Sequence, residues 1–501
     1  MRFKAINSEN LEKLSIFLSF FPVGIMMFIQ SLGWPNNFDD FYRGFNGINP
    51  DHNVLSYGWI KSEEMVKHII HDPLLTLSNQ FDYRFPILSG VIETILLMYF
   101  MYIVTELSLK SNKKSAAFSI IVLFNILTGV QAYIFLPPGA FPLAFSATFL
   151  ITVLANIKFD ALLISETNNA IKKMQAGLEI VSIGTLILLE QIAFIFYASN
   201  FFQSTIFWAA SNIQRIYYQR QTKNSVAPLK NLNLWSAVRF IPFLIINLIW
   251  RSKYGANGSE NFSKSVNILD GGIAAIKWNL AGTNLGGFLG MRPRASDLWD
   301  QPLWILAISV LAGIVIFFLA RWAVNQQKQD GVNTSTSKQL ILNLLLLGIS
   351  ISIGWTIPAF SERYYQELME VKTQTYVASR FAALGFILTI GVLTGFVVSH
   401  LKARQWMLLA VIVMISSVSI PQNIESLSDE HSRKSLRLTD VCSGEGEWNQ
   451  KEFLPKTIIS PGVDTRIWLT SFEKDYLNSS IEIKRQVAIN QFETNSLRFC
   501  R

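Results

Sequence analysis

The sequence is poor in the residues that most often bind metals, and it is poor in charge. Its 501 residues include two cysteines and five histidines, and neither an HExxH nor a GxxxxGK[ST] motif occurs. Charged residues make up 16% of the chain, against about 25% in an average soluble protein. These deficits argue against a zinc enzyme, a nucleotide hydrolase and a nucleic-acid-binding protein. No cofactor is expected.

Long apolar runs fill most of the chain instead. Half of the residues are hydrophobic, Phe alone contributes 37, and the mean hydropathy is +0.31. Such runs are typical of a polytopic membrane protein in a lipid bilayer. We predict an all-α fold with about eleven transmembrane helices, near residues 14–33, 85–107, 116–136, 141–157, 178–198, 201–217, 234–250, 303–323, 339–358, 381–400 and 405–420. The first run has no small-residue cleavage signal after it, which favours a retained anchor.

The positions of Lys and Arg indicate the orientation. Basic residues are frequent in the short connections 1–13, 108–115, 158–177, 218–233, 324–338 and 401–404. The much longer loops 34–84 and 251–302 carry only four and six. Because cytoplasmic loops are enriched in Lys and Arg, we predict a cytoplasmic N-terminus and an outward C-terminus. One long helix over 178–217 would reverse the later segments, so a hairpin is predicted there.

Two parts follow from this topology. Residues 1–420 form the membrane part, with outer loops at 34–84, 251–302 and 360–380, and the second of these is apolar enough to re-enter the bilayer. Residues 421–501, where hydrophobicity drops, form a small extracytoplasmic domain. Both cysteines, Cys442 and Cys500, lie in this tail. Outside the cytoplasm a disulfide between them is permitted and would stabilise a small domain; the alternative is two unrelated thiols.

The sharpest local feature is the acidic pair Asp39–Asp40, shortly after the first membrane segment and followed by Arg43. Adjacent carboxylates repel each other, and desolvation at a membrane surface adds to that cost. A carboxylate here could act as the general base toward a hydroxyl group or bind a divalent cation. The alternative is a capping Asp in a turn where the chain leaves the bilayer.

Arginines form a second candidate group, because the guanidinium binds phosphate with two parallel hydrogen bonds and keeps its charge when buried. The outward-side arginines near predicted membrane ends are Arg84, Arg251, Arg292, Arg294 and Arg380. For each of them, anchoring by extension to the membrane interface is the alternative. Arg380 is the closest to an apolar segment.

Several polar residues fall inside predicted membrane segments: Glu93, Glu190, Gln191 and Arg239. A charge at the bilayer centre costs roughly 2.5–3.5 kcal/mol on insertion scales, so such residues are functional candidates. The carboxylic acids could instead be neutral packing residues. For Arg239 we expect extension to the cytoplasmic face.

The chain resembles the GT-C superfamily of membrane glycosyltransferases. The resemblance is carried by a first membrane segment, a long outer loop opening with Asp39–Asp40 and Arg43, many further segments and an outward C-terminal domain. Within that group it is most similar to the serotype-converting O-antigen glucosyltransferases of bacteria and their phages. The resemblance implies an inner-membrane enzyme whose donor is a sugar on polyprenyl phosphate and whose acceptor is a cell-surface glycan. Asp39 or Asp40 would be the base, and a flippase and a donor-synthesising enzyme would be partners.

Two other functions stay open. An O-antigen or capsule polymerase would use a late outer loop with arginines, as 251–302 offers with Arg292 and Arg294. A transporter or flippase would favour inverted repeats and charges inside the membrane segments, and the sequence shows no repeat.

Overall fold

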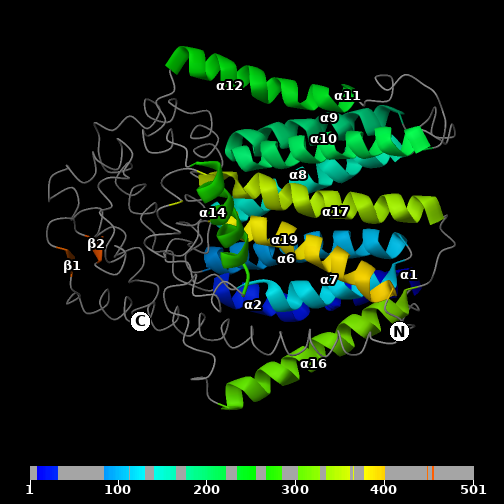
Figure 1. Ribbon diagram of the computed structural model, residues 1–501. Helices are drawn as coiled ribbons and strands as arrows, with labels where there is room; N and C mark the ends of the chain where they lie inside the picture. Colours follow the sequence, from blue (N-terminus) through cyan, green and yellow to red (C-terminus); the bar gives the residue numbers. More distant parts are fainter. Residues whose placement is uncertain are drawn as a thin grey trace, which may run out of the picture.

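The computed structural model describes thirteen stretches of the chain: 8–31, 84–111, 113–129, 140–164, 176–221, 234–254, 267–284, 303–327, 334–360, 365, 377–400, 448–449 and 454–455. Helices make up almost all of them, as the composition predicts. The long helices lie side by side as a bundle (Figure 1).

In chain order the helices are α1 (Ser8–Leu18), α2 (Phe21–Ser31), α6 (Arg84–Lys110), α7 (Lys114–Leu127), α8 (Ala140–Ile164), α9 (Ala176–Phe196), α10 (Ala198–Gln221), α11 (Leu234–Ala237), η4 (Val238–Phe240), α12 (Ile241–Tyr254), α14 (Ile268–Ala281), α16 (Leu303–Gln326), α17 (Thr334–Thr356), η6 (Ile357–Phe360) and α19 (Val377–His400). Of the predicted domain 421–501, two short strands are described. β1 (Trp448–Asn449) pairs antiparallel with β2 (Leu454–Pro455), with Trp448 opposite Pro455.

The described helices support membrane insertion but not the full count of eleven spans. Four spans in the described residues are long and apolar enough to cross a bilayer: Gly90–Lys110, Ala307–Gln326, Lys338–Phe360 and Ser379–Ser399. The bent pair α1–α2 makes a fifth if it counts as one span. Other predicted spans correspond to shorter apolar helices, such as Lys114–Leu127 and Gly184–Phe196. The segment predicted at 405–420 lies outside the described residues.

Helix α19 is the central helix of the bundle and packs against α7, α14 and α17. Small residues allow this close approach. A side chain on Gly385 would collide with the backbone of Ser352 in α17, and one on Gly395 would collide with the backbone of Ala116 in α7. Membrane helices associate through such small-residue contacts, because apolar burial gives no driving force between helices that are already in lipid.

The first helix pair, α1–α2, is bent by 51°. Pro22 lacks the N–H that would bond one turn back. In addition, the Asn125 side chain of α7 is inserted in the next rung of the helix: its amide nitrogen donates to the Ser19 carbonyl at 2.9 Å, and its oxygen accepts from the Val23 N–H at 3.1 Å. A side chain inserted in this way is a recognised cause of helix kinks.

The predicted hairpin over 178–217 is confirmed. Ser204 of α10 donates to the Glu190 carboxylate of α9 at 3.2 Å. In one continuous helix these two residues would be about 21 Å apart along the axis. The chain therefore reverses at the break between α9 and α10, near Tyr197.

Three of the predicted cytoplasmic connections meet at one end of the bundle. Lys114 donates to the Gln327 carbonyl at 3.0 Å, and the Gln327 side chain donates to the Glu12 carbonyl at 2.9 Å. These residues belong to the pieces 1–13, 108–115 and 324–338. The three connections thus lie on the same side of the bundle.

The described part of the loop 251–302 includes α14, which runs across the bundle at a steep angle to the long helices, beside the end of α17 (Figure 1). Asn267 caps its first turn by accepting from the Asp270 N–H. Trp278 is buried and donates to the Trp355 carbonyl at 3.1 Å, while Ile268 and Leu269 are exposed. Part of this predicted outer loop therefore packs on the helical bundle.

We expect Gly385→Leu to destabilise the protein by about 1–3 kcal/mol or more, because overpacking must push α17 and α19 apart. Thermal or denaturant unfolding of the purified protein in detergent measures this. Gly184→Leu is the matched control, since a Cβ at Gly184 has no atom within 4 Å and surface substitutions usually change stability by less than about 0.5 kcal/mol. Equal stability of the two variants would contradict the close-packing interpretation.

Candidate functional site

Among the predicted site residues, Arg380 is the one whose side chain the structure describes. Helix α6 begins at Arg84 and α12 includes Arg251, and for these two the backbone is described. The remaining predicted residues lie outside the described residues: Asp39, Asp40, Arg43, Arg292, Arg294, Cys442 and Cys500.

Arg380 forms an ion pair inside the bundle. It lies in the first turn of α19, and its Nη1 donates to Glu93 Oε1 of α6 at 2.7 Å. The two side chains expose 9% and 8% of their surface. Ser146 of α8 also donates to Glu93 Oε1, at 3.4 Å. The structure thus joins two candidates that the sequence suggested separately, the outward-side arginine and the intramembrane carboxylate.

Aromatic rings hold the helices around this ion pair. Phe145 and Phe381, the chain neighbours of Ser146 and Arg380, stack with ring centroids 6.4 Å apart. Trp355 lies 4.6 Å from the Phe381 ring and 5.3 Å from the Tyr197 ring. Its indole N–H donates to Gln203 Oε1 at 2.8 Å. The positions of α8, α17 and α19 are therefore fixed by rigid side chains next to Ser146 and Arg380.

The ion pair lies at the level where α2 ends. A Cβ on Gly24 of α2 would collide with Met98 of α6. The Phe20 and Phe100 rings both pack edge-on against Phe124. Helices α2 and α6 therefore run antiparallel. Ser31, seven residues after Gly24, comes level with residue 91 of α6, within one helical turn of Glu93.

The guanidinium of Arg380 is only partly used. Its Nε is buried and has no hydrogen-bond partner among the described residues. Since a guanidinium has five N–H donors in a planar fork, a single bond from Nη1 to Glu93 leaves room for a further acceptor. An oxyanion such as phosphate fits this fork.

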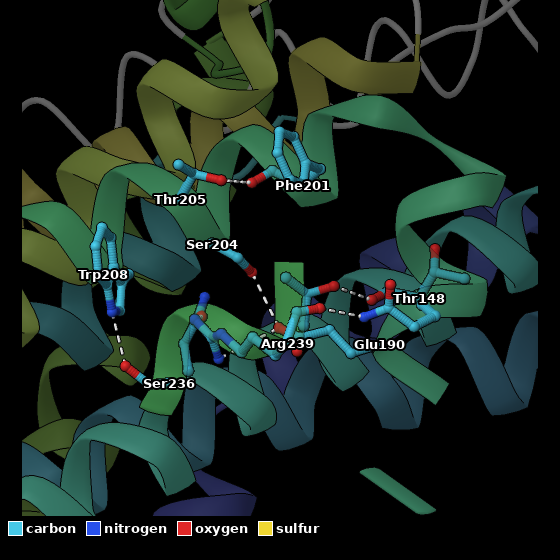
Figure 2. Close-up of polar contacts among 11 residues, drawn as sticks. Thr148, Glu190, Phe201, Ser204, Thr205, Trp208, Ser236 and Arg239 are labelled. Atoms are coloured by element: carbon cyan, nitrogen blue, oxygen red, sulfur yellow. Dashed lines mark hydrogen bonds and ion pairs between the residues drawn. The ribbon is translucent and has the colours of Figure 1, made fainter. Parts of the chain in front are cut away.

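A second buried ion pair lies between α9 and η4 (Figure 2). Arg239 Nη1 is 3.4 Å from Glu190 Oε1, and the side chains are 3% and 0% exposed. Ser204 donates to the same carboxylate oxygen, and Arg239 Nη2 donates to Asn156 Oδ1 of α8 at 2.8 Å. The Gln191 side chain donates to the Arg239 carbonyl at 2.6 Å. Four segments are joined through one charge pair.

The expectation that Arg239 extends to the cytoplasmic face is wrong. Its guanidinium lies between the rings of Phe159 and Phe240, 4.8 and 4.7 Å from their centroids. Cation–π contacts and the Glu190 carboxylate together compensate the burial of its charge. Asn156 and Ser204 were not predicted as partners, because a polar residue in an apolar segment shows no sign of which distant helix it faces.

No group of three or more His, Cys, Asp or Glu side chains suited to a metal occurs within the described stretches. The two ion pairs differ in their chemistry. Arg239 lies between two aromatic rings and donates to Asn156, which suits a structural link. Arg380 has no ring contact of this kind among the described residues and bonds to Glu93 through Nη1, which suits an anion-binding role at the end of the bundle.

Comparison of the chain with protein-family models, curated proteins and solved structures finds no match.

We expect Arg239→Met to destabilise the protein by about 3–5 kcal/mol, because it leaves Glu190 buried without a counterion. Adding Glu190→Leu should recover part of this loss. The four proteins of this double-mutant cycle are compared by unfolding in detergent. Lys110→Met is the control, because its side chain is 59% exposed and its i,i+4 pair with Glu106 should contribute less than about 0.5 kcal/mol. If the changes in unfolding free energy of the two single variants simply add in the double variant, Arg239 and Glu190 do not stabilise each other, and the interpretation is contradicted.

Proposed function

We propose that this protein is a glycosyltransferase of the outer face of the cytoplasmic membrane that uses a sugar carried on polyprenyl phosphate. One observation carries the proposal: Arg380 is buried at the end of the bundle where α2 finishes, and Asp39–Asp40 follow α2 in the chain. A cation suited to phosphate thus lies at the end of the bundle from which the chain continues to a pair of carboxylates. The resemblance to the GT-C superfamily points to the same chemistry.

The reaction needs two kinds of group. A hydroxyl oxygen of the glycan acceptor forms a bond to the anomeric carbon of the donor sugar, and the bond from that carbon to the phosphate oxygen breaks. The hydroxyl proton passes to a carboxylate, here Asp39 or Asp40, acting as the general base. The electron pair leaves with the phosphate, whose developing charge is stabilised by arginine.

Chain length is compatible with this assignment. Asp39 lies eight residues after Ser31, the last residue of α2. Eight residues span at most about 26–29 Å, and α2 ends within about a turn of Glu93 along the bundle axis. The chain is therefore long enough to bring Asp39 to the level of the Arg380 ion pair.

We expect Asp39→Asn or Asp40→Asn to abolish sugar transfer while the protein still inserts at normal abundance. Transfer from a radiolabelled polyprenyl-phosphate sugar to purified glycan acceptor measures the activity, and immunoblotting of membranes measures abundance. Asp51→Asn, a change of the same kind in the same loop, is the control and should keep its activity. Full activity of both single variants and of the double variant would refute the assignment.

The polymerase remains the alternative within the same chemistry. Glycan chain lengths of a deletion strain separate the two: a polymerase mutant accumulates single repeats, whereas loss of a decorating transferase leaves full-length chains without a side sugar.

A transporter of lipid-linked glycans is favoured by one specific observation, the two ion pairs within the helical bundle, since transporters carry functional charges inside their membrane segments. Activity in detergent separates this function from transfer. A glycosyltransferase turns over without sealed compartments, and a transporter does not.

A further inference from the structure

We propose that Glu93 is a displaceable counterion of Arg380: it holds the guanidinium in the empty site and gives way to a phosphate group of the ligand. This inference rests on the proposed function only in naming a phosphate as the incoming anion. It assigns Glu93 as a positioning residue that regulates how strongly Arg380 binds that anion.

The position of Glu93 is one that an anion would occupy. Its carboxylate accepts a hydrogen bond from Arg380, a residue of the first turn of α19, and the N-terminus of a helix favours negative charge. Arg380 comes from this same turn, so the positive end of the helix dipole and the guanidinium both attract an anion. The carboxylate and a phosphate oxygen would therefore compete for the same positive site.

The contact between Glu93 and Arg380 is suited to exchange. It involves one nitrogen of the guanidinium, Nη1, while the buried Nε has no acceptor among the described residues. A phosphate has enough oxygens to use two donors of the fork at once. Replacing a one-point contact by a two-point contact provides the differential affinity that a ligand needs to displace Glu93.

The charge of Glu93 opposes the binding of a second anion. With Glu93 paired, the Arg380 site is neutral. A phosphate added beside the pair would give it net negative charge in a poorly solvated interior, where like charges repel strongly. Ser146, which donates to Glu93 at 3.4 Å, provides a hydroxyl to which the carboxylate stays bound when Arg380 turns to phosphate.

The Glu190–Arg239 pair, in contrast, has the contacts of a permanent structural link. Arg239 donates to Asn156, lies between two aromatic rings, and has its backbone carbonyl bound by Gln191. Arg380 has no ring contact of this kind among the described residues. Glu190 is thus a matched control for Glu93: both are buried glutamates, each ion-paired to an arginine and bonded to a serine.

The test is a binding titration of the purified, full-length protein in detergent with polyprenyl phosphate. The wild type is compared with Glu93→Gln, Glu190→Gln and Arg380→Gln, and size-exclusion chromatography confirms that each is folded. Removing the competing charge should make Glu93→Gln bind about tenfold or more tightly. Glu190→Gln should bind like the wild type, and Arg380→Gln should bind far more weakly.

Uncharged polyprenol and inorganic phosphate serve as further probes. Polyprenol binding should not respond to Glu93→Gln. If Glu93→Gln binds only polyprenyl phosphate more tightly than the wild type does, the site recognises a lipid headgroup. If it binds inorganic phosphate more tightly by the same factor, the site recognises free phosphate. If Glu93→Gln does not fold, Glu93→Asp, which keeps the charge but shortens the side chain, should tighten binding by about two- to threefold through a weaker contact.

Unchanged or weaker phosphate binding in Glu93→Gln, or in Glu93→Asp where that variant is the one that folds, would overturn the proposal. If Arg380→Gln still weakens binding in that case, Glu93 is a fixed anchor and the proposed glycosyl transfer is unaffected. The transfer activity itself is decided by the Asp39 and Asp40 variants, so the two ideas fail independently.

Discussion

The structure depends on one constraint: a charge among apolar helices needs a partner. An isolated carboxylate or guanidinium in such surroundings costs several kcal/mol, and this cost selects which helices can be neighbours. Glu93 requires α19 beside α6, and Glu190 requires η4 beside α9. The remaining packing, by glycine contacts along α19 and by aromatic rings around Trp355, is compatible with these two pairings and makes them rigid.

The two ion pairs join different parts of the bundle. The Glu190–Arg239 cluster joins α8, α9, α10 and η4. The Glu93–Arg380 pair joins α6, α8 and α19 at the end where α2 terminates. A buried pair adds little net stability over a well-packed apolar contact. Its retention at the latter end is easier to understand when one of the partners has a further ligand.

Hydropathy and charge predicted the helices well and the contacts poorly. Runs of apolar residues predicted the helical segments, and the basic connections predicted a reversal near Tyr197 that the Ser204–Glu190 bond confirms. Neither signal contains the partner of Arg380, because Glu93 is 287 residues away in the chain. The interpretation of Arg239 was wrong for the same reason: local sequence showed a membrane end nearby but not the carboxylate of another helix. Patterns in a single sequence indicate which residues are buried and on which side of the membrane a loop lies. Contacts between helices depend on the tertiary structure.

The bend between α1 and α2 has a consequence for how the protein is made. Its geometry depends on Asn125, a residue synthesised about a hundred positions after the kink. Before α7 is synthesised, the Ser19 carbonyl and the Val23 amide lack this partner, and Pro22 is the cause of bending that is already in the chain. The contribution of Asn125 to the bend is thus acquired when α7 docks. A residue of the third predicted membrane segment thereby completes the shape of the first.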